Sequence, residues 1–192
     1  MTDSEVLDLF RQSGALLEGH FRLSSGLHSD RYLQSALVLQ HPDLAEHLGR
    51  EIALRTAHLE PTAVLSPALG GIVIGQEVGR ALRVRALFAE RQDGVLALRR
   101  GFTLSASDRV LVVEDVITTG GSTRETIVVA EAAGATIAGA AAIIDRGGNR
   151  DRLNVPLHSL VRLEIAAYPP DSCSLCTTGM PVVKPGSRNS PR

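Results

Sequence analysis

Residues 110–122 read V-L-V-V-E-D-V-I-T-T-G-G-S, and this stretch decides the fold of the chain. Its first four residues are apolar and three of them are β-branched, which is typical of a fully buried strand. Two adjacent carboxylates, Glu114 and Asp115, follow where that strand should reach the surface. A turn of small residues then leads into a helical pattern from about residue 123 to 133. This order predicts a ligand site at the carboxyl end of a sheet strand.

The turn at residues 118–122 has the chemistry of an anion site. It offers backbone N–H groups, hydroxyls and the positive end of the following helix, a combination suited to phosphate. The two acids offer acceptors for sugar hydroxyls, or negative charge beside a developing positive one. A phosphorylated sugar therefore fits both halves. The alternative is an ordinary strand-to-helix turn with Asp115 as a capping residue, which needs only one acid and one glycine.

Strand-like and helix-like stretches alternate on both sides of this segment. Helices are expected at residues 5–14, 42–58, 72–82 and 123–133, and strands at 62–65, 84–89, 110–113, 136–144 and 160–167. Such alternation with short turns predicts an α/β fold with an open, mostly parallel sheet flanked by helices. Residues 90–108 are expected to form a loop or hairpin that leaves this sheet.

The length of 192 residues and a hydrophobic content of 44% favour one domain with a substantial core. Within residues 1–192 we expect N-terminal elements over about 1–40 and the core sheet over about 60–167. Residues 168–192 are rich in proline and contain both cysteines. We therefore expect this tail to be irregular or partly disordered.

Charge and composition exclude several classes of protein. A net charge of −1 argues against a general nucleic-acid or membrane-surface binder, and an aromatic content of 3% argues against a base-stacking platform. No apolar run approaches the length of a membrane span, and residues 1–10 contain acids where a secretory signal needs basic and then apolar residues. We expect a cytoplasmic protein.

Residues 112–122 resemble the phosphoribosyl pyrophosphate signature of type I phosphoribosyltransferases, in which two acids follow an apolar strand and a Thr/Gly-rich loop follows the acids. Residues 66–71, S-P-A-L-G-G, resemble the family loop that contacts pyrophosphate through backbone amides, although many relatives have a lysine where this chain has Gly70. The resemblance implies that Glu114 and Asp115 hold the ribose hydroxyls and that residues 118–122 surround the 5′-phosphate. The implied donor-binding residues are Leu69, Gly70, Gly71, Arg91, Glu114, Asp115, Val116, Ile117, Thr118, Thr119, Gly120, Gly121 and Ser122.

Residues 19–29, G-H-F-R-L-S-S-G-L-H-S, resemble the F-x-L-x-S-G-x-x-S segment of orotate phosphoribosyltransferases, where an N-terminal hood helps to form the base pocket. The resemblance implies that Ser25 and Gly26 border this pocket, that Tyr32 packs against the pyrimidine, and that Thr118 contacts the base. Arg146 would bind the carboxylate of orotate through two parallel hydrogen bonds. The alternative for Arg146 is a solvated loop arginine.

Together these motifs imply a glycosyltransferase (pentosyltransferase) of pyrimidine nucleotide (UMP) biosynthesis. It would transfer ribose 5-phosphate from phosphoribosyl pyrophosphate to orotate, with Mg²⁺ as cofactor, and give orotidine 5′-monophosphate and pyrophosphate. A homodimer is implied, because a mobile loop commonly reaches the neighbouring subunit's site in this family. Two alternatives remain at this point: a phosphoribosyltransferase for a purine base, and a regulator that binds phosphoribosyl pyrophosphate without turnover.

The loop at residues 90–102 departs from the family pattern. Arg91 matches a leading arginine and is the expected catalytic residue of this loop, beside Glu114 and Asp115. The lysine and histidine that usually follow it are missing. Arg99 and Arg100 are candidates to replace them at a phosphate, since guanidinium binds phosphate well. The alternative is that both arginines lie at a solvated hairpin end.

The positions of the cysteines and histidines in the sequence do not indicate a metal site. Cys173 and Cys176 have the spacing of half a structural zinc site, but the other half is absent unless His158 or a second subunit supplies it. We therefore expect free or redox-labile thiols. His20 and His28 are expected to be polar surface or hydrogen-bonded structural residues, because no cysteine or carboxylate stands at metal-ligand spacing from them in the sequence.

Overall fold

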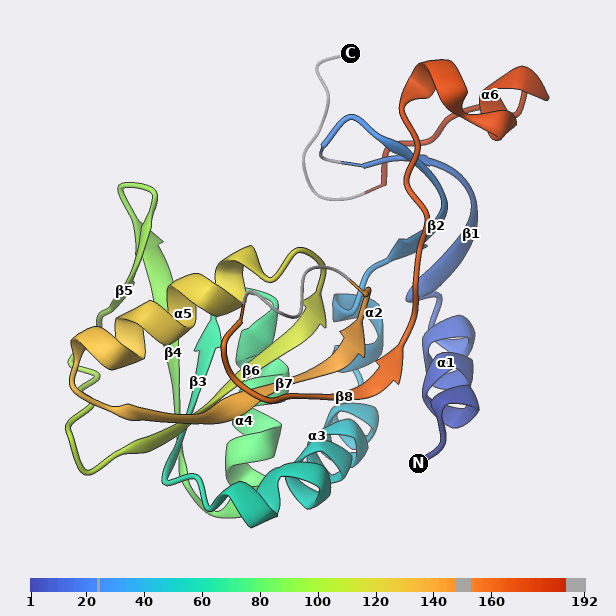
Figure 1. The fold of residues 1–192 in the computed structure, drawn as a ribbon. Coiled ribbons are helices and arrows are strands. Elements are labelled where there is room, and N and C mark those ends of the chain that lie inside the picture. Colours follow the sequence, from blue (N-terminus) through green and yellow to red (C-terminus); the bar gives the residue numbers. More distant parts are fainter. Residues whose placement is uncertain (24, 148–152, 186–192) are drawn as a thin grey trace.

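A computed structural model describes residues 1–23, 25–147 and 153–185, and its centre is a six-stranded sheet (Figure 1). The strand order is β5-β4-β3-β6-β7-β8, and every neighbouring pair is parallel except β4 and β5. The strands of this sheet are β3 (Ala63–Pro67), β4 (Arg85–Gln92), β5 (Val95–Leu98), β6 (Arg109–Ile117), β7 (Thr136–Asp145) and β8 (Leu157–Arg162). The predicted mostly parallel α/β sheet is confirmed.

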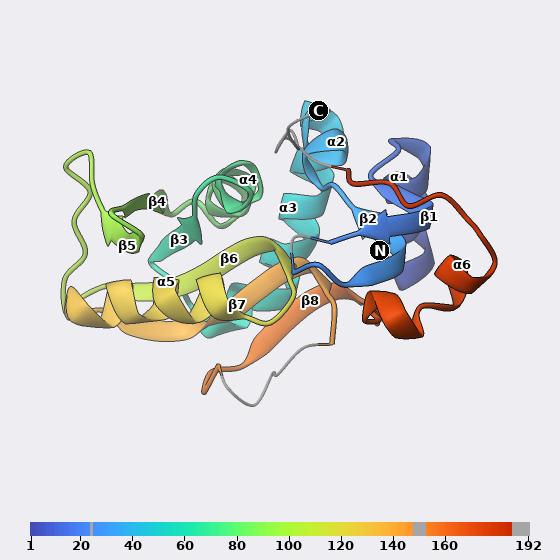
Figure 2. The same ribbon diagram turned by 90° about the horizontal axis from the view of Figure 1, so that it is seen from above.

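The sheet is covered on both faces because its central strands are apolar on both sides. In β6, Leu111 and Val113 join the core that contains α1 (Asp3–Gln12), α3 (Pro42–Thr56) and α4 (Gly71–Leu82). Val110 and Val112, on the opposite face, join the core beneath α5 (Gly121–Ala132). All four side chains are fully buried, as expected for a strand whose side chains alternate between two covered faces. Figure 2 shows α5 on one side of the sheet and α3 and α4 on the other.

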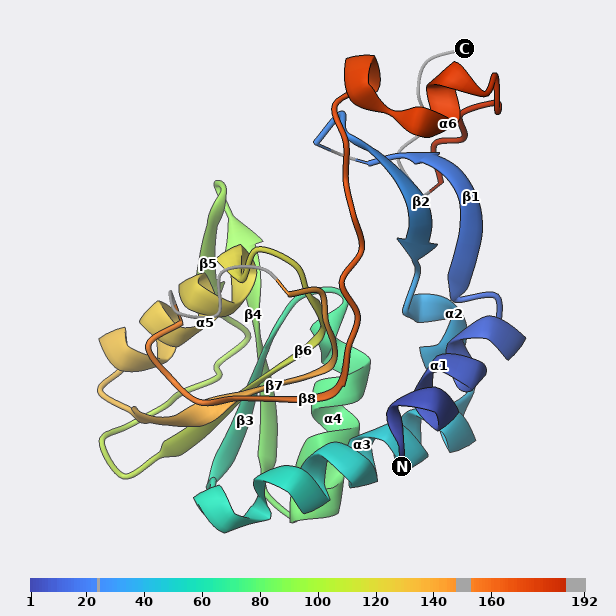
Figure 3. The same ribbon diagram turned by 45° about the vertical axis from the view of Figure 1, so that its right-hand side comes forward.

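The N-terminal segment forms a separate antiparallel pair, β1 (Leu16–Arg22) and β2 (His28–Leu33), which stands beside the main sheet (Figure 3). A short helix, α2 (Ala36–Leu39), links this pair to α3. The described part of the tail is held against the pair on both edges. Tyr168 pairs with His28, and Val183 pairs with Phe21.

Short helical turns occur in the tail at Pro170–Ser172 and at α6 (Ser174–Thr177). The described part of the tail, residues 168–185, therefore contains only brief regular elements, as its proline content favours. It is nevertheless placed against the β1–β2 pair.

Most element boundaries differ by a few residues from the sequence prediction, and two regions differ in a way that affects the site: the end of the last strand, and the hairpin at residues 90–98, whose second strand stays in the sheet. The last strand ends at Arg162, so residues 163–167, which we expected to be strand, leave the sheet and run toward the β1–β2 pair. Residues 90–98 belong to a hairpin of β4 and β5 whose turn residues Asp93 and Gly94 both have positive φ, +52° and +85°. That backbone matches the twist of a tight two-residue hairpin turn. Among the described residues, no helix is long and apolar enough to cross a bilayer.

Candidate active site

The predicted motif loops lie at one edge of the sheet, since the carboxyl ends of parallel strands meet there. The residue 66–71 loop begins with the last two residues of β3, residues 118–122 follow β6, and Arg146 follows β7. The residue 66–71 loop closely approaches Asp115 near the end of β6. A Cβ placed on Gly70 would lie 2.8 Å from each carboxylate oxygen of Asp115, so glycine leaves this space beside the carboxylate open.

Glu114 is buried and faces the first turn of α5. Its carboxylate accepts hydrogen bonds from the hydroxyls of Ser122 and Thr123. Burial raises the pKa of Glu114, and these two hydrogen bonds oppose the rise by favouring the charged form. The side chain therefore joins the end of β6 to the phosphate loop and does not line either of the two cavities described below.

Asp115 is partly exposed and lines a cavity of about 350 Å³ together with Leu69, Gly70 and residues of α2. Its carboxylate accepts a hydrogen bond from the hydroxyl of Ser35. The sequence analysis missed Ser35 and α2, because a lone serine before a four-residue helix carries no recognisable pattern. The contact fixes Asp115 at the mouth of a space bounded by the residue 66–71 loop.

A second cavity, of about 520 Å³, brings four of the predicted base-pocket residues together. They are Ser25 and Tyr32 from the β1–β2 pair, and Thr118 and Arg146 from the sheet edge. Most of the other lining side chains are apolar. The rest of the lining consists of Leu23, Leu27, Leu33, Thr119, Gly147, Ile165 and Ala167.

Gly26 is not among these lining residues and occupies the turn between β1 and β2 with φ +85°. Ile165 and Ala167 were missed as pocket residues because the apolar stretch 160–167 reads as a strand.

Arg146 is the charged group of the larger cavity. Its backbone N–H donates to the carbonyl of Ile117 at 2.9 Å, which ties the loop after β7 to the end of β6. Burial lowers the pKa of its guanidinium, yet arginine stays protonated at neutral pH. Its Nε is buried and has no hydrogen-bond partner among the described residues. A half-buried cation with an unused donor favours an anionic ligand in this cavity.

The remaining predicted donor residues form the end of β6 and the loop that follows it. Val116 and Ile117 pack into the sheet end, and Ile117 is 4% exposed. Thr118 and Thr119 line the larger cavity, so the residue 118–122 loop forms part of its wall. Gly120 has φ +72° and caps α5, a conformation that favours glycine.

Arg91 lies on the β4–β5 hairpin, outside the lining of both cavities. Its guanidinium binds the carboxylate of Glu125 on α5 at 2.8 Å and donates to the carbonyl of Gly94 at 2.6 Å. Arg100 pairs with Glu90 at 3.0 Å, and Arg99 is exposed. The structure therefore does not bring the hairpin arginines to Asp115, and their catalytic roles stay predictions.

Two predicted motifs extend beyond the described residues. Ser24, within the N-terminal motif, and Gly148, after Arg146, lie outside them.

Two phosphate-type loops at the carboxyl edge of a parallel sheet, with a separate N-terminal β-pair over an adjoining cavity, define a type I phosphoribosyltransferase. The chain is 52% identical to orotate phosphoribosyltransferase of Pelotomaculum thermopropionicum over 98% of this chain and 99% of that protein. It is 50% identical to the enzyme of Chlorobaculum parvum, over 99% and 98%. The chain belongs to the orotate phosphoribosyltransferase family, and it is an enzyme, a pentosyltransferase.

Solved structures agree with this assignment. Orotate phosphoribosyltransferase from Aeropyrum pernix superposes with a TM-score of 0.71 at 26% identity, covering 83% of this chain and 94% of that one. The Mycobacterium tuberculosis enzyme in complex with phosphoribosyl pyrophosphate shares the fold, with a TM-score of 0.66 at 23% identity, over 84% and 96%. No family model matches the chain.

Proposed function

We propose that this chain transfers ribose 5-phosphate from phosphoribosyl pyrophosphate to orotate, with the base held in the 520 Å³ cavity. The observation that carries the proposal is the unpartnered Nε of Arg146 in an otherwise largely apolar pocket. Orotate is a flat pyrimidine with a carboxylate, and guanidinium matches a carboxylate through two parallel hydrogen bonds. A neutral purine base would leave that charge without a counterion.

The donor would occupy the adjoining sheet edge. Residues 118–122 offer N–H groups and hydroxyls at the start of α5, which suits the 5′-phosphate. Asp115, at the mouth of the 350 Å³ cavity, would accept hydrogen bonds from the ribose hydroxyls. Thr118 belongs to both regions, so the acceptor nitrogen and the anomeric carbon would lie next to each other.

The reaction needs positioning and electrostatics more than a covalent nucleophile. As pyrophosphate leaves, positive charge develops on the ribose, and the carboxylates of Glu114 and Asp115 offset it. Negative charge grows on the leaving group, and Arg91 would offset it once the β4–β5 hairpin moves the guanidinium away from Glu125. In the proposed homodimer this hairpin reaches the neighbouring subunit's site.

Mg²⁺ is the proposed cofactor. The ion would be held mostly by water and by oxygens of the substrate, as Mg²⁺ commonly is beside phosphates, so no dedicated set of protein ligands is required. When bound, the ion neutralises charge on the diphosphate of the donor. The cytoplasmic location expected from the sequence is also part of the proposal.

The test measures two quantities with the purified chain, phosphoribosyl pyrophosphate and Mg²⁺: the loss of orotate absorbance and the release of pyrophosphate. We expect both to occur, and the pyrophosphate release to depend on orotate and on the metal ion. Adenine and xanthine in place of orotate should give no release. Release with a purine base, or binding of phosphoribosyl pyrophosphate with no turnover on orotate, would overturn the proposal. Light scattering during gel filtration tests the homodimer.

A further inference from the structure

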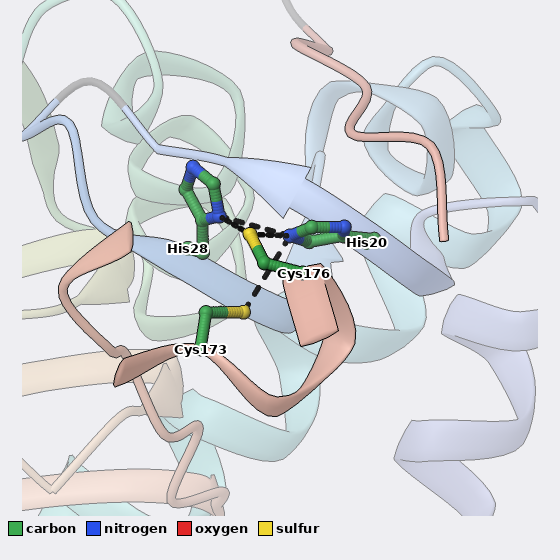
Figure 4. A group of neighbouring side chains, drawn as sticks. All are labelled: His20, His28, Cys173 and Cys176. Atoms are coloured by element: carbon green, nitrogen blue, oxygen red, sulfur yellow. Dashed lines mark hydrogen bonds between the residues drawn. The ribbon is translucent and has the colours of Figure 1, made fainter. Parts of the chain in front are cut away.

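Four side chains that the catalytic proposal does not use meet between the β1–β2 pair and the tail (Figure 4). They are His20 from β1, His28 from β2, and Cys173 and Cys176 from the tail around α6. One ligand atom of each lies within 4.8 Å of the others. His20 and His28 are hydrogen-bonded and buried, not polar surface, and they stand beside the cysteines where the sequence analysis considered only His158 or a second subunit. The pairing has no sequence signal because β1–β2 and the tail are far apart in sequence but adjacent in the fold.

The distances within the group are close to those of a metal centre. His20 Nε2 lies 2.9 Å from His28 Nδ1, 3.5 Å from the sulfur of Cys173 and 3.7 Å from that of Cys176. His28 Nδ1 lies 3.2 Å from the Cys176 sulfur. Zinc bonds of about 2.0–2.1 Å to nitrogen and about 2.3 Å to sulfur place neighbouring ligand atoms of a tetrahedron about 3.3–3.8 Å apart. Small outward shifts of the imidazoles reach these spacings.

The surroundings orient one histidine as a ligand. The Nδ1 of His20 is 2.7 Å from the carbonyl of Met180, which can only accept a hydrogen bond, so Nδ1 carries the proton. The lone pair of Nε2 then faces the two sulfurs and His28. A backbone carbonyl that fixes the imidazole in this way is typical of metal-bound histidine.

Burial supports a closed structural site rather than a surface cluster. His20, His28 and Cys173 are 3%, 6% and 1% exposed, whereas Cys176 is exposed and leaves a route for entry. Both thiols are free of a disulfide. Four nitrogen and sulfur donors and no oxygen ligand select zinc over Mg²⁺ or Ca²⁺.

We propose that His20, His28, Cys173 and Cys176 bind one structural Zn²⁺ ion. Binding requires both cysteines as thiolates and both histidines neutral, so two thiol protons are released for each ion taken up. All four coordination positions are filled by protein, which leaves no open position for catalysis.

The ion would link two segments that border the base pocket. The two histidines flank the turn that carries Leu23, Ser25 and Leu27, and the cysteines lie six and nine residues after Ala167 in the sequence. Apart from the metal, two backbone pairings, Tyr168 with His28 and Val183 with Phe21, and the hydrogen bond between His20 and the carbonyl of Met180 hold the described tail to β1 and β2. A metal bridge between them adds a link that survives local fraying of these short pairings.

The test starts with the untagged full chain, desalted without chelator and analysed for metals by mass spectrometry. We expect about one zinc ion per chain. After the zinc is removed, added Co²⁺ should produce the visible absorption bands of a tetrahedral site and a thiolate-to-metal charge-transfer band. The zinc form is colourless, so these bands report binding directly. This readout uses the native sequence, so it does not depend on whether a variant folds.

Two variants and one control locate the site. Cys176→Ser and His28→Gln should each lower zinc affinity by more than about tenfold in a competition titration with a chromogenic chelator. His58→Gln is the matched control, because His58 also stacks beside another histidine, His158, at a ring distance of 5.5 Å, but has no thiol near it. It should keep full zinc content.

Three results would overturn the proposal. One is a natively folded chain that contains no zinc and takes up none when zinc is added. Another is a Cys173–Cys176 disulfide in the freshly purified protein. The third is equal zinc content in Cys176→Ser, His28→Gln and the control.

Discussion

Replacing Arg146 with alanine tests the base pocket most directly. The guanidinium has no partner at Nε within residues 1–23, 25–147 and 153–185, so its removal leaves few groups of these residues unsatisfied. A hydrogen bond to a charged group contributes about 1.5–3 kcal/mol, and a bidentate contact with the carboxylate contains two. Loss of both costs about 3–6 kcal/mol, which corresponds to roughly 100- to 10,000-fold in kcat/KM for orotate.

The assay follows orotate absorbance at saturating phosphoribosyl pyrophosphate, and then varies the donor at the highest usable orotate concentration. We expect the KM for orotate to rise far more than the KM for the donor. The melting temperature should stay close to that of the unmodified chain, because the side chain makes no internal ion pair to Nε. Arg162→Ala is the control. Arg162 ends β8 and pairs with Glu164 at 2.8 Å, and both side chains are exposed, so its loss removes an arginine from outside the cavity lining.

Uracil lacks the carboxylate and separates recognition from general damage. In Arg146→Ala, kcat/KM should fall for orotate but hardly change for uracil. The ratio of the two kcat/KM values should therefore fall by nearly the same factor as kcat/KM for orotate. Equal rises in both KM values, or an unchanged preference for orotate, would refute the assignment and make Arg146 a structural residue.

The other predictions concern the sheet edge. Asp115→Asn should lower kcat by about 100-fold or more while circular dichroism and the melting temperature hardly change, because the residue is partly exposed and Ser35 can still donate to the amide oxygen; near-normal turnover would contradict its role. Glu114 has a pKa raised by burial from 4.5, so the native chain binds more protons than the unfolded chain above that pH. Its contribution to the free energy of unfolding therefore falls as the pH rises from 4.5 through the raised pKa. Over that pH range the stability of Glu114→Gln should rise relative to that of the unmodified chain by up to about 1.4 kcal/mol per pH unit in denaturant titrations. Parallel stability curves for the two proteins would count against this prediction. Gly75→Ala would place a Cβ 2.0 Å from the hydroxyl oxygen of Ser66, and should destabilise the fold by about 1–3 kcal/mol in the same titrations; an unchanged midpoint would exclude this contact.

The sheet could be predicted because its signals are local. Residues 110–113 are apolar at every position, and only a strand covered on both faces is buried that way. The loops after β3, β6 and β7 were then placed at one edge by topology alone. Ser25, Tyr32, Thr118 and Arg146 lie together in the cavity as the resemblance implied, while their roles remain to be measured.

What could not be predicted depends on contacts between distant segments. Ser35 reaches Asp115 across 80 positions, and the cysteines reach His20 across more than 150. No spacing rule within one segment reports such a pair. The ion pair of Arg91 could not be predicted for a different reason: Glu125 lies one helical turn into α5, and an exposed acid on a helix gives no sign of the arginine it binds.

The tail that crosses both edges of the β1–β2 pair has a consequence for synthesis. The base pocket joins residues of the sheet edge to residues of the β1–β2 pair and to Ile165 and Ala167, whereas the two donor loops lie within residues 66–122. A growing chain can therefore complete its donor loops before residues 165–183 emerge from the ribosome. Until then the acceptor side stays open, so a nascent or C-terminally truncated chain would bind the sugar phosphate without a finished place for the base.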